Sequence, residues 1–334
     1  MPTLLRRTLF AILIIIAALT LWVAMRPDMS EVGIPYAEPA AATSGLRVRW
    51  LGIATLLFDD GETQIMTDGF VSRPSGLDLL LKRPIAPDTE AIRGAIASQN
   101  IDHLAAIMPV HSHYDHAMDT ADFALMTGAD ILGSVSTANI ARSSSVPETR
   151  IKTVNLGESY SYGRFTITFY PSKHAPLPTS AGIDGVVDEP FTLPAPYTAW
   201  QEGQSYSIYI DHPEGSALVQ GSAGFIPGAL NNIQADTVFL GAGGIIDMPP
   251  EYVSAYVDEI VHAVTPSQVY IIHQDDLLGE FGNVEQNKLL LSFDKVFAFD
   301  LLQSVLPARL MQMSFGVDVS LSGIRAEIPE TNIE

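Results

Sequence analysis

Directly after a short apolar run that ends at Val110, the chain reads HSHYDH. An apolar run of this length is typical of a buried strand. On an extended backbone alternate side chains project to the same side, so His111, His113 and Asp115 converge and His116 is offset toward a second point. Imidazole and carboxylate groups placed in this way are ligands that zinc and iron accept. The motif therefore predicts a metal site at the end of a buried strand.

Cysteine is absent from all 334 residues. Its absence excludes disulfides, cysteine-based zinc sites, iron–sulfur clusters and a thiol nucleophile. Any metal must therefore be held by histidines and carboxylates, which the HSHYDH motif supplies.

The N-terminal segment carries an apolar run from Leu9 to Met25, preceded by Arg6 and Arg7 and closed by Arg26. The run is near the lower length limit of a membrane-spanning helix and somewhat long for the core of a signal peptide. We interpret residues 1–26 as a signal anchor, with a cleaved signal peptide as the alternative. The arginine pair favours a cytoplasmic N-terminus, which places the bulk of the chain outside the cytoplasm, either membrane-anchored or secreted.

Acidic residues outnumber basic ones by 38 to 18, which gives a formal net charge of −20. This balance disfavours nucleic acid as a partner, because phosphate backbones are bound mainly by clustered Lys and Arg. Residues 1–26 hold three arginines and no acid, so the rest of the chain carries −23. Anionic lipid surfaces should repel so acidic a domain, and we expect membrane attachment to rest on the N-terminal helix.

Predicted strands and helices interleave from residue 46 onward, which indicates an α/β fold. Residues 27–45 are rich in Pro and Ala, show no helical or alternating period, and are interpreted as a linker. The expected organisation is thus the anchor or signal over 1–26, the linker, and one large domain over 46–334. Strands are expected at Leu46–Leu51, Ala54–Phe58, Thr63–Thr67, Leu104–Val110, Ile151–Val154, Phe165–Tyr170, Tyr206–Ile210, Ala217–Gln220, Thr237–Leu240 and Val269–Ile272, and helices at Asp88–Ser98, Ala117–Met126, Thr137–Ala141 and Pro250–Ala263.

Four further segments carry a resemblance to a known family. They are WLGIAT followed by MTDG near the start of the domain, Lys173-His174-Ala175, GSAGF around Ser222, and IIHQDD at 271–276. With the HSHYDH motif they make the chain resemble the metallo-β-lactamase fold superfamily of metal-dependent hydrolases over nearly the whole of 46–300. The branch it resembles most contains lactonase-like hydrolases and N-acyl-phosphatidylethanolamine phospholipase D. The resemblance implies a four-layer αβ/βα sandwich with a metal site at one edge, between the two sheets.

The same resemblance implies which residues hold metal. Each of two metals would have three protein ligands, namely His111, His113 and His174 at the first and Asp115, His116 and His273 at the second. Asp68 corresponds to an aspartate of the early strands that braces the metal loop from behind the ligands.

Ser222 stands where many dinuclear members of the superfamily have an aspartate that bridges the metals. Serine cannot supply this bridge, yet each metal keeps three ligands without it, as in one similar subclass of the β-lactamases. We therefore expect two zinc ions, with iron or manganese as alternatives, and a lower affinity at the second site than in aspartate-bridged relatives. Ser222 is expected to be a hydrogen-bonding group beside the ligands.

This ligand set predicts a metal-dependent hydrolase. Zinc lowers the pKa of bound water to about 7 and polarises the group under attack. Asp115 is expected to orient the resulting hydroxide toward an ester, lactone, amide or phosphodiester bond. Two alternatives remain open, an iron-dependent oxidoreductase of the same fold and a non-catalytic metal-binding protein.

A loop of about 30 residues lies between His174 and Tyr206 and contains Phe191, Tyr197 and Trp200. Loops of this length are functional lids or disordered insertions in most proteins. Its aromatic content and its place after a predicted ligand favour a lid over the site. An apolar lid, a membrane tether and an acidic surface together predict a neutral or amphipathic substrate, either a small molecule or a lipid-like compound.

Overall fold

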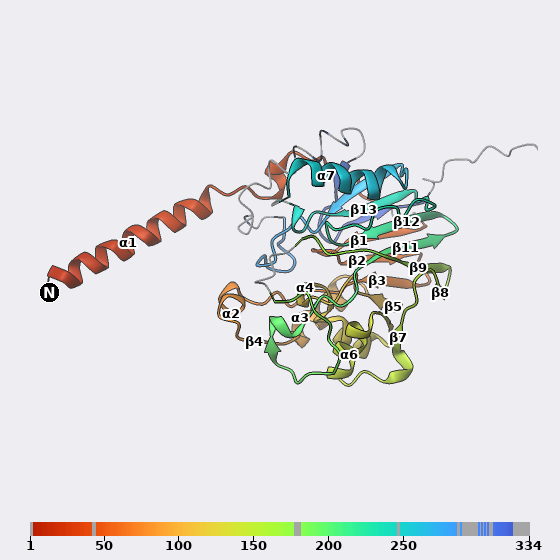
Figure 1. Ribbon diagram of the computed structural model, residues 1–334, viewed down its shortest axis with the longest axis horizontal. Helices are drawn as coiled ribbons and strands as arrows, with labels where there is room; N and C mark the ends of the chain where they lie inside the picture. The colour runs from red at the N-terminus through yellow and green to blue at the C-terminus, as the bar shows by residue number, and fades with distance from the viewer. Residues whose placement is uncertain are drawn as a thin grey trace, which may run out of the picture.

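The computed structural model describes residues 3–41, 45–176, 182–245, 248–285, 288, 300, 302, 304, 306 and 310–322. Within these ranges the chain forms two seven-stranded mixed sheets that face each other (Figure 1). The first sheet has the order β16 (Asp318–Ser320), β1 (Arg47–Trp50), β2 (Leu56–Asp59), β3 (Gln64–Thr67), β5 (Leu104–Met108), β6 (Asp130–Gly133) and β7 (Ile151–Thr153). The second has the order β15 (Leu310–Gln312), β14 (Gln268–Ile272), β13 (Thr237–Gly241), β12 (Gly215–Gln220), β11 (Tyr206–His212), β9 (Phe165–Pro171) and β8 (Ser159–Tyr162).

Helices cover the outer face of each sheet. α3 (Thr89–Ser98), α5 (Thr120–Thr127) and α6 (Val135–Ser143) pack on the first sheet, and α7 (Pro250–Val257) lies over the second (Figure 1). The layers are therefore helix, sheet, sheet and helix, which confirms the predicted α/β class and the four-layer sandwich.

The main core lies between the sheets, where apolar side chains of both are buried. Phe58 of β2 meets Phe239 of β13 edge to face, with ring centroids 5.7 Å apart. Aromatic pairs in this geometry add to the stability that burial of the rings provides. The predicted strands coincide with observed ones, each with bounds shifted by up to two residues, because their β-branched and aromatic residues alternate or run as buried segments.

Short or polar strands were missed by the sequence prediction. They are β4 (Pro84–Ile85), β6, β8, β10 (Ala195–Pro196), β15 and β16. Strands of two to four residues contain too few side chains for a period to show in the sequence. The helix expected at 250–263 is also different, because it is divided into α7 and a π-helical turn at Asp258–His262.

The predicted linker is not free of the domain over its described part, residues 27–41 and 45. Asp28 caps a short 3₁₀ helix, Met29–Val32, in which Met29 is fully buried. Farther along, Tyr36 bridges to Gln312 of β15, and the Ala37 amide donates to the Gln312 carbonyl at 2.8 Å. The segment packs on the domain because burial of its scattered apolar residues is favourable. The Pro- and Ala-rich composition gave no sign of these few buried residues.

The N-terminal helix α1 (Thr3–Ala24) projects away from the domain (Figure 1). Its segment Leu5–Ala24 is long and apolar enough to cross a membrane, by length and composition only. This agrees with either a signal or an anchor.

Candidate metal centre

Three histidines from three loops meet at one edge of the sandwich. His111 and His113 follow β5, and His174 follows β9 of the other sheet. His111 Nε2 lies 3.0 Å from His113 Nδ1, and one nitrogen from each of the three rings lies within 4.8 Å of the others. The structure thus places together the first ligand group that the resemblance implies.

Hydrogen bonds fix which ring nitrogen of His113 and of His174 faces the group. His113 Nε2 donates to the Ile183 carbonyl at 3.0 Å, which leaves Nδ1 for a metal. His174 Nδ1 donates to the Ala175 carbonyl at 2.7 Å, which leaves Nε2. Bonds of this kind orient imidazole ligands and set their tautomer.

The second group consists of Asp115, His116 and His273, and their ligand atoms also lie within 4.8 Å of one another. Asp115 Oδ2 is 3.4 Å from His116 Nε2 and 3.5 Å from His273 Nε2. His273 directly follows β14, so both sheets contribute to this group as well.

The backbone of the motif differs from the extended one we predicted. The chain turns at His113 into the short helix α4 (Tyr114–Ala117), which carries Asp115 and His116. Strand alternation therefore does not bring Asp115 beside His111 and His113. The helical turn places it with His116 at the second group, so the grouping is the expected one although the local geometry is not.

Asp68 supports the second group from behind. Its Oδ2 accepts a hydrogen bond from His116 Nδ1 at 2.7 Å, and its Oδ1 accepts one from the Val110 amide at 2.8 Å. The bond to His116 leaves that residue's Nε2 facing Asp115. Asp68 follows β3 and is fully buried, which fits the bracing role that the resemblance implies.

Burial and mutual proximity set the charge states of the centre. Burial lowers the pKa of His113 and of His174 to about 4, so both rings are neutral at pH 7, the form that binds metal. Burial opposes ionisation of Asp115, but His116 and His273 outweigh it and hold the pKa of Asp115 well below its usual range. At neutral pH the first group therefore offers the neutral imidazoles of His113 and His174, and the second group an ionised carboxylate. In the second group burial opposes protonation of His116, but the neighbouring carboxylates of Asp68 and Asp115 outweigh it and raise the pKa of His116.

These residues fit a pair of divalent metal ions. His116 Nε2 is buried and has no hydrogen-bond partner among the described residues, although buried polar atoms normally have one. A metal ion at the second group would satisfy it. Nitrogen and oxygen donors without sulfur suit zinc, iron and manganese alike, so the donor set does not select among them.

Ser222 lies beside the first group and belongs to neither ligand set. Its Oγ accepts a hydrogen bond from the Ala175 amide at 3.0 Å, one residue after His174. Ser222 therefore holds the backbone that carries His174, in line with the expected hydrogen-bonding role.

The sequence prediction missed the buried ion pair that supports the His273 loop. Arg73 donates to Asp275 at 3.0 Å, and Asp275 also accepts the Ile53 amide at 2.9 Å. The Ile53 carbonyl in turn accepts the His273 amide at 2.8 Å. Asp275, two residues after His273 in the HQDD segment, was a signal that could have pointed to this pair.

Gly243 is a second missed feature. A Cβ atom built at this position would lie 2.7 Å from atoms of the His273 ring, closer than side chains pack. The close approach requires glycine here, so Gly243 fixes one side of the His273 ring.

The loop predicted as a lid forms a wall that packs on the domain over its described part, and residues 177–181 of it lie outside the described residues. Trp200 of this loop is buried and packs edge to face on Phe191, with ring centroids 5.0 Å apart. The strand β10 within the loop pairs with β4. Of the three aromatic residues that suggested a lid, Trp200 is a core residue and cannot contact a substrate.

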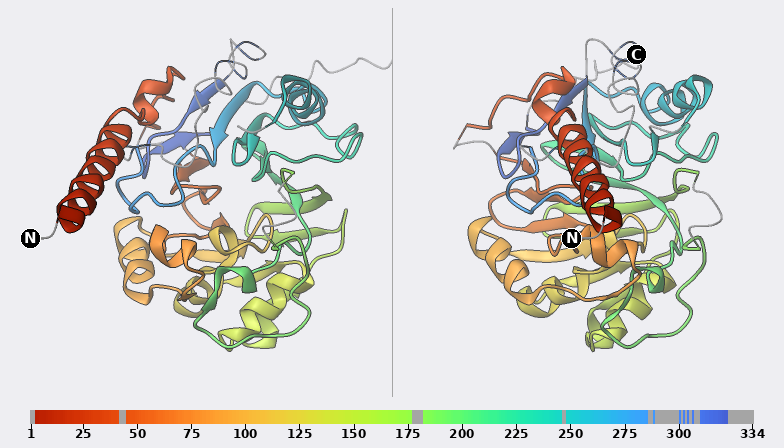
Figure 2. Two further views of the ribbon diagram at one scale, coloured as in Figure 1. Left: turned by 60° about the vertical axis from the view of Figure 1, so that its left-hand side comes forward. Right: turned by 90° about the vertical axis from the view of Figure 1, so that its left-hand side faces the viewer.

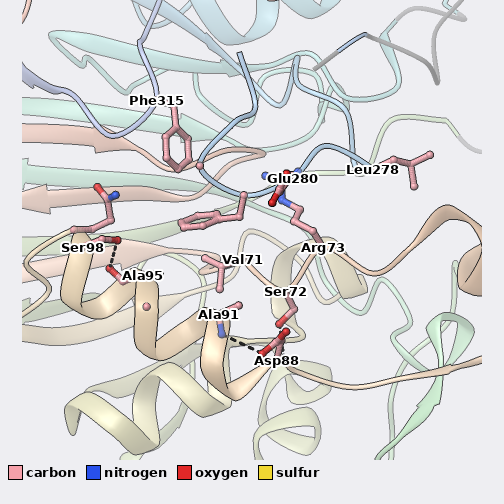
Figure 3. A pocket seen from close by; sticks show the side chains of 14 residues that line it. Val71, Ser72, Arg73, Asp88, Ala91, Ala95, Ser98, Leu278, Glu280 and Phe315 are labelled. Carbon is pink, nitrogen blue, oxygen red and sulfur yellow. Dashed lines mark hydrogen bonds between the residues drawn. The ribbon is translucent and has the colours of Figure 1, made fainter. Parts of the chain in front are cut away.

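The described residues line two neighbouring cavities. One has a volume of about 490 Å³ and apolar walls formed by Gly76, Leu79, Leu80, Tyr114, Tyr197 and Leu278. Tyr114 belongs to the HSHYDH motif, so this cavity adjoins the residues of the second group. The other cavity, of about 600 Å³, is drawn in Figure 3 between α3 and the Arg73 side chain, and Leu278 lines both.

Comparisons with known proteins agree with this geometry. No family model matches the chain. Three curated relatives, all described as UPF0173 metal-dependent hydrolases, match it. The one from Pyrobaculum calidifontis is 22% identical over 264 residues, 70% of this chain and 99% of the relative. The one from Pyrobaculum arsenaticum is 23% identical over 210 residues, 61% of this chain and 75% of the relative. Of the third, from Pyrobaculum islandicum, the chain spans only 45%, at 24% identity over 120 residues.

Solved structures share the fold. A metallo hydrolase of Ignicoccus hospitalis has a TM-score of 0.50 at 13% identity, covering 82% of this chain and 97% of its own. CmlA, a diiron β-hydroxylase of Streptomyces venezuelae, has a TM-score of 0.52 at 15% identity, covering 85% of this chain and 55% of its own. An isothiocyanate hydrolase from Delia radicum gut bacteria has a TM-score of 0.50 at 13% identity, covering 83% of this chain and 99% of its own. The chain thus has the α/β metallo-β-lactamase fold, and its sequence is similar to those of the UPF0173 metal-dependent hydrolases.

Proposed function

We propose that the chain is a metal-dependent hydrolase whose six ligands hold two zinc ions. The observation that carries the proposal is the convergence of five histidines and one aspartate into two groups of three. The similarity to the UPF0173 metal-dependent hydrolases supports it. Bound zinc would supply a reactive water at neutral pH and polarise the bond under attack.

Asp115 is the proposed catalytic residue. Its carboxylate stays ionised at neutral pH, since neighbouring histidines hold its pKa low. A carboxylate of low pKa is a weak base, so Asp115 Oδ atoms accept a hydrogen bond from the attacking water and orient it rather than retain its proton. Burial raises the pKa of the Tyr114 hydroxyl well above its usual value, so this group keeps its proton and can donate to the substrate.

The apolar cavity beside Tyr114 supports an amphipathic or neutral substrate with an ester, lactone, amide or phosphodiester bond. A cavity of about 490 Å³ falls within the range of small-ligand pockets. The lactonase-like or phospholipase-D-like branch is part of this proposal. We also propose that α1 attaches the chain to the outer side of a membrane, with secretion after cleavage as the alternative. Nucleic acid is not a proposed partner.

An iron-dependent oxidoreductase is the second candidate, favoured by the donor set, which accepts iron as readily as zinc. CmlA, which shares the fold, is described as a diiron enzyme. Metal analysis of protein purified without added metal separates the two candidates, because an oxidoreductase of this kind requires iron.

The test of hydrolysis is a panel of ester, lactone, amide, β-lactam, phosphodiester and phosphomonoester substrates, each ester with a long and a short acyl group. We expect zinc-loaded protein to cleave one bond class, and Asp115→Asn to lose most of that activity while its first group still binds zinc. Fully metal-loaded protein that leaves every bond class intact contradicts the proposal and favours the non-catalytic or redox alternatives.

A further inference from the structure

The short helix α2 (Gly76–Leu80) exposes leucines that a water-facing helix would not carry. Leu77, Leu80 and Leu81 are 55%, 78% and 53% exposed. Their spacing of three and four residues places them on one face of the turn. Leu79 instead packs inward against the apolar cluster around Phe70 and Tyr114. α2 therefore presents a small apolar surface that nothing in the described part of the chain covers.

The domain is held close to the end of α1. α1 ends at Ala24, and Met29, five residues later, is already buried in the domain. Five residues span at most about 18 Å even when fully extended. If α1 crosses a membrane, the domain cannot move far from the bilayer surface.

α1 and α2 lie on the same side of the domain. In Figure 1 α1 leaves the domain toward the left, and α2 lies at its left-hand edge. The turned view in the left half of Figure 2 agrees, since α1 and the orange segment that contains α2 again lie on one side. The apolar surface of α2 thus faces the space that a bilayer around α1 would occupy.

Two basic residues follow the leucines directly, in a chain that is otherwise strongly acidic. Lys82 is exposed, and the Arg83 side chain is 53% exposed and pairs with Asp78 at 3.4 Å. Leucines beside Lys and Arg are the composition of segments that lie in the membrane interface, where apolar side chains enter the lipid and basic ones meet phosphates.

We propose that α2 with Lys82 and Arg83 forms a membrane-contact surface, a second attachment point besides α1. Leu77, Leu80 and Leu81 enter the interfacial region of the bilayer, and the basic pair contacts lipid phosphates. The proposal differs from the expectation that anionic lipid surfaces repel so acidic a domain, because Lys82 and Arg83 make the flank of α2 locally basic.

The surface is continuous with the apolar cavity beside the metal centre. Leu80 lines the cavity and is also the most exposed of the three leucines, while Tyr114 lines it next to the ligand Asp115. Contact with lipid would place the cavity opening at the bilayer, and this consequence rests on the proposed function.

The absence of cysteine allows a direct test with the full chain in lipid vesicles. Leu80→Cys, labelled with an environment-sensitive fluorophore, is compared with the matched control Leu156→Cys. Leu156 is 47% exposed and lies three residues after β7, a strand that Figure 1 shows on the side of the domain away from α2. We expect a blue shift at position 80, quenched by spin-labelled lipid, and neither effect at position 156.

Equal emission at the two positions, whether water-like or lipid-like, overturns the proposal. In vesicles that contain anionic lipid, Lys82→Glu combined with Arg83→Glu should reduce the shift at position 80, and an unchanged shift refutes the role of the basic pair. The readout needs no catalysis, so inactive protein with a blue-shifted label contradicts the proposed hydrolase and leaves the contact surface standing.

Discussion

Replacing Asp68 with asparagine tests how the second ligand group is held. The carboxylate accepts two hydrogen bonds on different oxygens, one from His116 Nδ1 at 2.7 Å and one from the Val110 amide at 2.8 Å. An asparagine of the same size has only one oxygen. Whichever way its amide turns, one of the two buried donors then faces an NH₂ group and loses its acceptor.

The expected loss follows from this count. A buried donor left without a partner costs about 1–3 kcal/mol. Loss of the group that orients a metal-bound histidine lowers metal affinity by about 10–100-fold. If His116 Nδ1 loses its acceptor, the zinc affinity of the second group falls. If the Val110 amide loses its acceptor, the free energy of unfolding falls.

The assay is competitive zinc titration of Asp68→Asn against a chelator of known affinity, together with denaturant unfolding. Asp119→Asn is the matched control, since Asp119 is equally buried and accepts the Val71 and Ser72 amides on Oδ2 and the Ser72 hydroxyl on Oδ1, but contacts no ligand histidine. We expect Asp119→Asn to lose stability with zinc affinity unchanged. The reasoning is refuted if Asp68→Asn binds zinc at the second site as tightly as the wild type and unfolds at the same denaturant concentration.

Three further predictions concern the rest of the site. Trp200→Ala should lower the free energy of unfolding by about 3–5 kcal/mol, because a large buried side chain is removed; a change smaller than 1 kcal/mol in urea unfolding would count against its place in the core. Gln201→Ala should weaken zinc binding at the first group. The Gln201 side chain donates to the Gly182 carbonyl and accepts from the Gly185 amide, on either side of the Ile183 carbonyl that orients His113. A zinc affinity that titration finds unchanged would mean that this loop does not position His113. Metal-free protein should lose stability as the pH falls from 6.5 to about 4. Burial lowers the pKa of His113 and of His174 to about 4, so in this pH range the unfolded chain binds protons at these two histidines and the folded chain does not. Denaturant midpoints that stay level across this range would contradict those pKa values.

The ligand types were readable in the sequence because they cluster within one motif. HSHYDH supplies four of the six ligands, and His174 and His273 follow strands that β-branched and aromatic residues mark clearly. Their division into two groups came from the resemblance and not from strand periodicity. The helical turn that begins at His113 shows why, since four residues carry too little pattern to reveal a helix.

The supporting contacts were less predictable because they join residues far apart in the chain. Arg73 and Asp275 are separated by about 200 positions, and the Ile183 carbonyl is a backbone group without sequence identity. In the loop after His174, aromatic composition alone does not distinguish Trp200, a core residue, from Tyr197, which lines the apolar cavity.

The measurement that tests the account most directly is the metal content of the full-length protein after dialysis against a weak chelator. Wild type, His174→Gln and His273→Gln are compared, since each variant removes one ligand from a different group. The account predicts two metal equivalents per chain in the wild type and the loss of one equivalent in each variant. A wild type that retains no metal, or variants that retain as much as the wild type, would contradict it.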